Sequence, residues 1–269
     1  MRRSRGPAPV LSTAPMLRVP VSDLSEGDLA LDAEAARYVA RVHRKKPGDV
    51  CLLFDPARAL EAEATVLRID KDKVVCRVEP LRPASVRPPR EVTLLQGIGK
   101  GDKFDAIVRD ATELGATGIV AVESARTIVR LGDKAPARIE RWRRIAIEAS
   151  RQCGRGDAPT VEGPHGFAEA VRAHAESPAL KLCFWEKATE PAGPHLRGLG
   201  VEQPIVFVVG PEGGLEEGEV EEARKAGFHV VSLGPLVLRT ETVAAAVLGA
   251  ALLCGGIGSV MIRARGVDE

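Results

Sequence analysis

The chain has 269 residues, of which 45% are hydrophobic, 28% are charged and 3% are aromatic, and its formal net charge is +1. This length allows one large domain or two ordinary ones with a real apolar core. The charge excludes a chain that is basic throughout, although a local basic face could still bind RNA. So few aromatic rings argue against an RNA reader that works by stacking bases.

Cysteine usage narrows the class further. The cysteines are odd in number, far apart and without a C-x-x-C pair, so we expect neither a disulfide framework nor a metal site, but reduced thiols in a cytoplasm. They are Cys51, Cys76, Cys153, Cys183 and Cys254.

Two segments near the ends of the chain have unusual composition. Residues 1–10 are basic and then rich in proline, which predicts a disordered tail, with a phosphate-touching arm as the alternative. Residues 242–262 carry no charge and have the length of a membrane span. Glycines at 255, 256 and 258 interrupt them, so we predict a buried helix of about 12 residues followed by a Gly-rich turn or strand.

The first part of the chain is predicted to form short strands joined by tight turns, with one short helix at residues 32–42. The strands are expected at residues 18–21, 50–54, 62–69 and 74–78, and the turns at 46–49 and 70–73. This pattern favours a small β-barrel. Residues 81–90, with three prolines and three arginines, form the best linker candidate.

After the linker, strands and helices alternate. Strands are predicted at residues 92–97, 118–122, 180–185, 204–209 and 230–233, and helices at 103–114, 136–153, 167–174, 216–226 and 242–253. Such alternation indicates an α/β domain with a mostly parallel sheet and helices on both faces.

The sharpest chemical signal is an apolar strand, residues 205–209, that runs into Gly210-Pro211-Glu212-Gly213-Gly214. Glycines allow a tight turn or the close approach of a ligand, and ligands of α/β sheets bind where strands end. The segment matches neither a P-loop nor a dinucleotide fingerprint. The acids Glu216, Glu217 and Glu219 follow and would repel a phosphate, so a cationic or neutral ligand suits this loop better.

The second signal is residues 233–244, where a strand end is followed by Arg239, Thr240, Glu241 and Thr242 at the start of an Ala-rich helix. Thr240 and Glu241 fit ordinary helix capping. Arg239 opposes the helix dipole and therefore needs a partner. That partner is expected to be Glu241, Glu212 or a substrate phosphate.

Together these segments resemble the SPOUT methyltransferases, and specifically the ribosomal RNA small subunit methyltransferase E family. That family carries G-P-E-G-G followed, about two dozen residues later, by L-G-x-x-(I/V)-L-R-T-E-T-A. Residues 103–117, 141–155 and 44–49 resemble three further segments of the family in the same order. The pattern departs at Trp185, where the family has His, and at Leu236, where it has Arg.

The resemblance implies an α/β SPOUT domain with a deep trefoil knot over residues 91–262, and a small N-terminal PUA-like β-barrel that binds RNA over residues 17–82. It implies S-adenosylmethionine as cofactor, a homodimer, and Arg239 and Glu241 as catalytic residues. The implied cofactor-binding residues are Phe184, Trp185, Glu186, Val209, Gly210, Pro211, Glu212, Gly213, Gly214, Leu233, Gly234, Leu236, Leu238 and Thr242.

Basic residues supply candidate RNA contacts, each with a plainer alternative. They are Arg18, Arg44, Lys45, Lys46, Arg126, Arg151 and Arg155. Arg151 and Arg155 could instead belong to a solvated salt-bridged helix face, and Arg126 could simply decorate a loop. The run at residues 44–46 is usually plain surface, but in a PUA-like barrel it would steer RNA.

The predicted function is methylation of N3 of a uridine in 16S ribosomal RNA near the decoding site, on the assembled small subunit in the cytoplasm. A SPOUT enzyme for another RNA position and a non-catalytic assembly factor are the alternatives. The histidines show no ligand partner at useful spacing, so no metal is expected. They are His43, His165, His174, His195 and His229.

Overall fold

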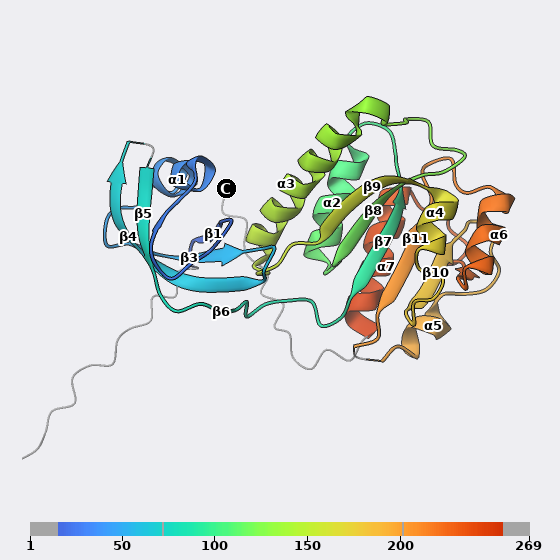
Figure 1. Ribbon diagram of the computed structural model, residues 1–269. Helices are drawn as coiled ribbons and strands as arrows, with labels where there is room; N and C mark the ends of the chain where they lie inside the picture. Colours follow the sequence, from blue (N-terminus) through green and yellow to red (C-terminus); the bar gives the residue numbers. More distant parts are fainter. Residues whose placement is uncertain (1–15, 72, 201, 255–269) are drawn as a thin grey trace, which may run out of the picture. The chain divides into compact units, whose positions relative to one another are not determined.

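The computed structural model describes residues 16–71, 73–200 and 202–254. The predicted N-terminal tail and the Gly-rich segment after the last helix lie outside these residues. The chain divides into two compact units, one of residues 1–55 and 60–83 and one of residues 56–59 and 84–269 (Figure 1). The division falls within the predicted linker, residues 81–90.

The first unit is built on one sheet with the strand order β1-β3-β4-β5-β2, and β6 pairs with β4. Its elements are β1 (Arg18–Pro20), β2 (Gly27–Ala30), α1 (Ala33–Arg37), β3 (Val50–Asp55), β4 (Leu60–Asp70), β5 (Lys73–Val78) and β6 (Arg82–Pro83). Alternate residues of β5 are buried, as in a strand with one face on a core. The sequence predicted β1, β3, β4 and β5, but not β2 or β6.

The predicted helix at residues 32–42 is confirmed. Asp32 caps it, because its carboxylate accepts a 2.8 Å hydrogen bond from the Ala35 N–H. One π-helical turn, η1 (Tyr38–Val42), continues α1. The segment buries Ala35, Ala36 and Val39 in the core of the first unit.

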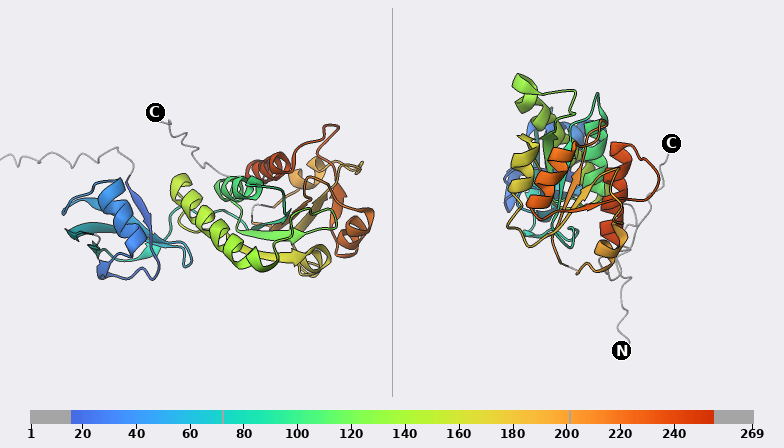
Figure 2. Two further views of the ribbon diagram at one scale, coloured as in Figure 1. Left: turned by 90° about the horizontal axis from the view of Figure 1, so that it is seen from above. Right: turned by 90° about the vertical axis from the view of Figure 1, so that its right-hand side faces the viewer.

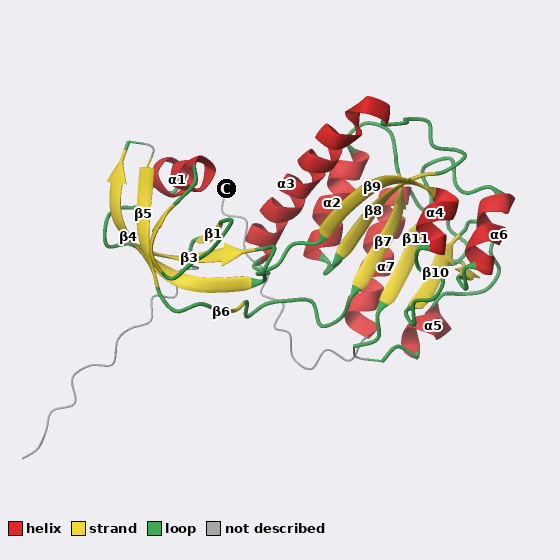
Figure 3. Ribbon diagram, in the orientation of Figure 1, coloured by secondary structure: helices red, strands yellow, loops and turns green. Residues whose placement is uncertain are grey.

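The second unit is an α/β domain whose sheet is parallel throughout, with the strand order β12-β10-β11-β7-β8-β9. The strands are β7 (Val92–Gly97), β8 (Gly118–Glu123), β9 (Thr160–Gly166), β10 (Leu180–Phe184), β11 (Ile205–Val209) and β12 (His229–Val231). The helices are α2 (Lys103–Glu113), η2 (Gly132–Lys134), α3 (Ala135–Cys153), α4 (Phe167–Arg172), α5 (Gly193–Arg197), α6 (Glu217–Lys225) and α7 (Thr240–Cys254). Figure 3 shows the alternation of strands and helices that the sequence predicted.

Helices cover both faces of this sheet (Figures 1 and 2). α2, α3, α5 and α7 pack on one face, and α4 and α6 pack on the other. Strand β11 shows why its sequence is a continuous apolar run. Phe207 packs into the core under α2, α3, α5 and α7, and Val208 packs into the core under α4 and α6. Every residue of the strand is therefore buried.

Helix α7 is the Ala-rich segment whose length suggested a membrane span. It begins at Thr240, two residues earlier than predicted, and buries Val247 and Leu248 in the core. Within the described part of the chain, no helix has the length and apolarity that crossing a membrane would require.

Candidate active site

A cavity of about 580 Å³ opens where β10, β11 and β12 end. These three strands are neighbours in the sheet, so their carboxyl ends lie at one edge. The walls come from residues 184–186 after β10, residues 209–215 after β11 and residues 231–240 after β12, with Lys103 from α2 and Val243 from α7.

All predicted cofactor residues except Thr242 line this cavity. Thr242 is exposed on α7 and does not contribute to the wall. The wall also contains residues that the sequence did not assign to the cofactor, namely Lys103, Leu215, Val231, Ser232, Pro235, Val237, Thr240 and Val243. Most of these are chain neighbours of predicted residues, but Lys103 comes from a distant helix, and the family-like segment at residues 103–117 did not mark it as a site residue.

The Gly-Pro-Glu-Gly-Gly loop needs glycine on both sides of a close contact. A Cβ atom on Gly97, at the end of β7, would lie 2.4 Å from the Pro211 nitrogen. Gly214 has a φ of +72°, a conformation that favours glycine. Its N–H donates a 2.9 Å hydrogen bond to the Pro211 carbonyl, which closes the turn.

Gly213 is constrained by a protein neighbour. A Cβ atom there would lie 3.0 Å from the Cβ of Arg126 and 3.3 Å from its carbonyl oxygen. Arg126 in turn donates a 3.0 Å hydrogen bond from Nη1 to the Gly213 carbonyl. Arg126 therefore constrains this glycine, and the space that Gly213 was expected to leave for a ligand stays a prediction.

A buried hydrogen-bonded chain fixes the start of the loop. The Thr240 hydroxyl donates to the Gly210 carbonyl at 2.6 Å and accepts from Gln96 Nε2 at 2.9 Å. Gln96 is fully buried and its amide also donates to the Gly97 carbonyl at 3.0 Å. Strand β7, the loop and helix α7 are thus held together by one hydroxyl.

Lys103 takes the acidic partners that were expected for Arg239. Its Nζ lies 3.0 Å from Glu212 Oε1 and 3.9 Å from Glu241 Oε2. Burial alone would raise the pKa of Glu212, but hydrogen bonds from its own N–H and that of Lys100, with the pairing to Lys103, hold this pKa below its usual value. The Glu212 carboxylate is therefore tied to the protein.

Arg239 lies exposed at the cavity wall. Within residues 16–71, 73–200 and 202–254, no hydrogen bond or ion pair reaches its guanidinium. The prediction of a pair with Glu241 or Glu212 is therefore wrong in this structure: Lys103 holds Glu212 and is the nearer cation to Glu241, at 3.9 Å. Of the three expected partners, only a substrate anion is left.

The predicted RNA contacts fall into exposed and buried groups. Arg44, Lys45 and Lys46 lie in the loop between η1 and β3, where Arg44 and Lys46 are exposed. Arg18 is largely buried, with its guanidinium 3.5 Å from Glu61 and 4.9 Å from the centre of the Phe54 ring. RNA contacts of all four stay predictions, and the loop residues fit them better.

Arg151 and Arg155 are buried, with 8% and 3% of their surface exposed. Arg151 pairs with Glu148 on the same helix. Arg155 donates to the carbonyls of Thr112 and Ala116 at 2.9 and 2.8 Å, and it pairs with Asp157. Both arginines therefore have structural contacts within the protein. The RNA contacts predicted for them stay predictions, and their burial disfavours these contacts.

Comparison with known proteins defines the class first. A family model described as an RNA methyltransferase domain matches residues 86–252, and one described as an RNA methyltransferase PUA domain matches residues 31–79. The first match spans the parallel-sheet unit and its cavity. The protein is therefore an RNA methyltransferase in family and fold.

Individual relatives narrow this class. The chain is 31% identical to ribosomal RNA small subunit methyltransferase E of Bacillus subtilis over 79% of this chain and 85% of that protein. The enzyme of the same name from Mycobacterium tuberculosis is 33% identical over 82% of this chain and 84% of its own. A crystal structure of the Neisseria gonorrhoeae enzyme, bound to S-adenosyl methionine, superposes with a TM-score of 0.79 at 32% identity, covering 87% and 96% of the two chains. The chain belongs to the ribosomal RNA small subunit methyltransferase E family.

Proposed function

We propose that this protein uses S-adenosylmethionine to methylate N3 of a uridine in 16S ribosomal RNA near the decoding site, acting on the assembled small subunit in the cytoplasm. The observation that carries the proposal is the exposed Arg239 at the wall of the cavity, where neither Glu212 nor Glu241 pairs with it and both form ion pairs with Lys103. A cation without a protein partner is suited to an anionic substrate.

The residues that line the cavity suit the chemistry of the cofactor. S-adenosylmethionine supplies an electrophilic methyl group on a positively charged sulfonium. Glycines 210, 213, 214 and 234 bring backbone close to the cavity, and Glu186 places a carboxylate at its wall. Trp185 Nε1 is buried beside the cavity without a hydrogen-bond acceptor among the described residues. A bound ligand with an acceptor atom would satisfy it.

Arg239 is the proposed catalytic residue. Arginine keeps its charge, so it does not act as a base. Its guanidinium can hold a phosphate or stabilise the negative charge that develops on uracil as N3 loses its proton. Glu241, which the sequence offered as a catalytic partner, is half-buried and faces Lys103, so we assign it a positioning role through that lysine.

The test is methyl transfer to 30S particles with the substitution Arg239→Ala. We expect the rate to fall by about a hundredfold or more, as for other lost transition-state stabilisers, while cofactor affinity and melting temperature change little. Arg109→Ala, an exposed arginine on α2, is the matched control. Wild-type rates in Arg239→Ala would remove the catalytic role, and a joint loss of melting temperature and cofactor binding would make the residue structural.

Mass spectrometry of the product tests the substrate. Methylation at N3 of one 16S uridine supports the proposal. A methyl group on a ribose 2′-oxygen or another base would assign a different RNA position. Cofactor binding without transfer to any ribosomal RNA would point to an assembly factor.

The proposal includes the architecture that the family implies. We propose that the first unit closes as a PUA-like barrel and that the second, residues 91–262, is a SPOUT domain knotted around α7, which packs on α2, α5 and β11. We also propose a homodimer. Leu236 and Val237, which precede α7, are 76% and 87% exposed, so this loop offers apolar side chains for contact with a second copy. An active protein that sediments as a monomer would contradict the dimer.

A further inference from the structure

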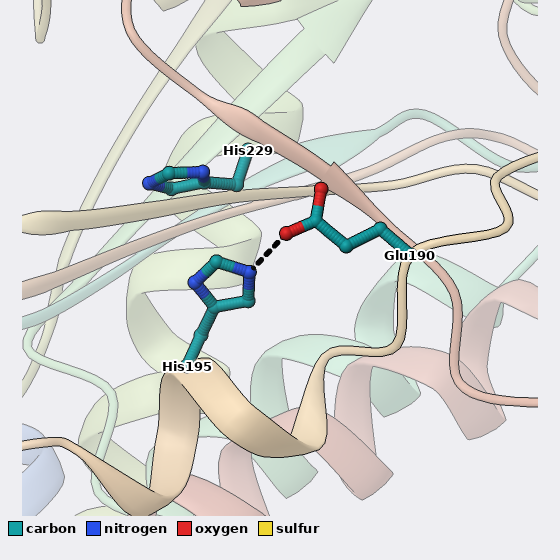
Figure 4. Close-up of side chains that lie close together, drawn as sticks. All are labelled: Glu190, His195 and His229. Carbon is teal, nitrogen blue, oxygen red and sulfur yellow. Dashed lines mark hydrogen bonds and ion pairs between the residues drawn. The ribbon is translucent and has the colours of Figure 1, made fainter.

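Two histidines that are far apart in the sequence meet on the surface of the second unit (Figure 4). His195 lies on α5 and His229 begins β12, and their ring centroids are 4.5 Å apart. Glu190, in the segment before α5, lies 2.6 Å from His195 through Oε1 and Nε2. One ligand atom from each of the three residues lies within 4.8 Å of the others. The spacing of these residues along the chain did not indicate the cluster, because the fold brings them together.

We propose that Glu190, His195 and His229 form an open binding site for a divalent transition-metal ion of the zinc class. Imidazole nitrogens and a carboxylate are the donors that such ions prefer, whereas magnesium and calcium prefer oxygen donors alone. Three protein ligands leave one position of a tetrahedral site for water.

The geometry allows coordination after small side-chain movements. Ligand atoms around a tetrahedral zinc ion lie about 3.3 Å apart, as bonds of roughly 2.0 to 2.1 Å require. The Glu190 carboxylate is 53% exposed and His229 is exposed, so both can rotate. Among the described residues no hydrogen bond reaches the His229 ring, so its nitrogens are available. His195, 19% exposed, is the more fixed member.

The ion would join segments that border the cavity. The Glu190 carbonyl accepts a 2.8 Å hydrogen bond from the Ser232 N–H, and the Ala192 N–H donates to the Ser232 carbonyl at 3.0 Å. Ser232 lines the cavity. Coordination would therefore tie α5 and the segment before it to β12 and stabilise this side of the domain. The inference stands independently of the proposed methyl transfer.

The test is zinc titration by calorimetry with the untagged, chelator-treated full chain. Cys153 and Cys254 are exposed and would compete for zinc, so all variants carry Cys153→Ser and Cys254→Ser. We expect one zinc ion per chain and a melting temperature that rises by roughly 5 °C or more at about a hundredfold excess over Kd. Magnesium should produce neither effect.

The variants decide whether these residues bind the ion. His229→Ala and the near-isosteric Glu190→Gln should each weaken zinc binding at least tenfold and abolish the thermal shift. His165→Ala is the matched control, because His165 also pairs with a glutamate, Glu169, at 3.1 Å, but without a second histidine. Zinc binding that survives in His229→Ala and Glu190→Gln, or that is absent from the parent protein, would overturn the proposal.

Discussion

The hydroxyl of Thr240 joins the start of the Gly-Pro-Glu-Gly-Gly loop, residues 210–214, to strand β7. It donates to the Gly210 carbonyl and accepts from Gln96, and Thr240 itself is only 6% exposed. Thr240→Val keeps the shape and the β-branched side chain but removes the hydroxyl. The Gly210 carbonyl and one N–H of Gln96 then lose their partner together.

The cost follows from these two groups. A buried polar group without a partner costs about 1–3 kcal/mol. The Gln96 amide keeps its 3.0 Å hydrogen bond to the Gly97 carbonyl, so the cost of its lost partner lies at the low end of this range. We therefore expect Thr240→Val to destabilise the domain by about 2–4 kcal/mol and to lower the melting temperature by roughly 5–15 °C. Because Gly210 begins the loop, affinity for S-adenosylhomocysteine should also fall about tenfold, which corresponds to one lost hydrogen bond.

Thr242→Val is the matched control, since Thr242 lies on the first turn of the same helix but is exposed and outside the cavity wall. Its effect should stay within about 0.5 kcal/mol. Differential scanning calorimetry measures stability, and isothermal titration measures affinity. If the two variants behave alike in both experiments, the hydroxyl does not organise the loop and the reasoning fails.

Two further substitutions test the contacts of the same loop. Gly97→Ala should weaken cofactor binding at least tenfold and destabilise the domain by about 1–3 kcal/mol, because the added Cβ would lie 2.4 Å from the Pro211 nitrogen; unchanged affinity in titration would contradict this contact. Lys103→Met should make stability less sensitive to acid. The lowered pKa of Glu212 contributes stability that is present above its unfolded pKa and is lost as pH falls through the folded pKa; without Lys103 this pKa is lowered less, so less stability is lost on acidification. Melting temperatures of both proteins measured across acidic pH test this expectation. Parallel curves for the two proteins would refute the pairing.

Much of the fold could be predicted because the second unit alternates regularly. Strand β7 was predicted with its observed bounds, and α3 within one residue. The misses have physical causes. β9 contains the dipeptide Gly163-Pro164 and ends at Gly166, which are turn signals, and α5 is only five residues long. β2 has no alternating apolar pattern, since it is mostly exposed.

The cavity could be predicted only where it is built from contiguous chain. Its loops follow β10, β11 and β12, so motifs marked them. Lys103 reaches the cavity from α2, and His195 and His229 meet through the order of the sheet. The spacing of such residues along the chain carries no information about their distance in space, so even the family-like segment at residues 103–117 did not mark Lys103 as a cavity residue.

The presence of an arginine in a family-like motif did not indicate whether that arginine has a structural or a functional role. Arg155 and Arg239 both stand in segments that resemble the family's, and the sequence offered both as functional. The structure separates them by their acceptors. Arg155 is 3% exposed, and its guanidinium donates to backbone carbonyls that end α2, where a cation also suits the helix dipole. Arg239 opposes a helix dipole, and the carboxylates that could compensate it form their ion pairs with Lys103 instead. A cation in that position becomes more stable when an anion arrives, and this is why Arg239 is the arginine expected to meet the RNA.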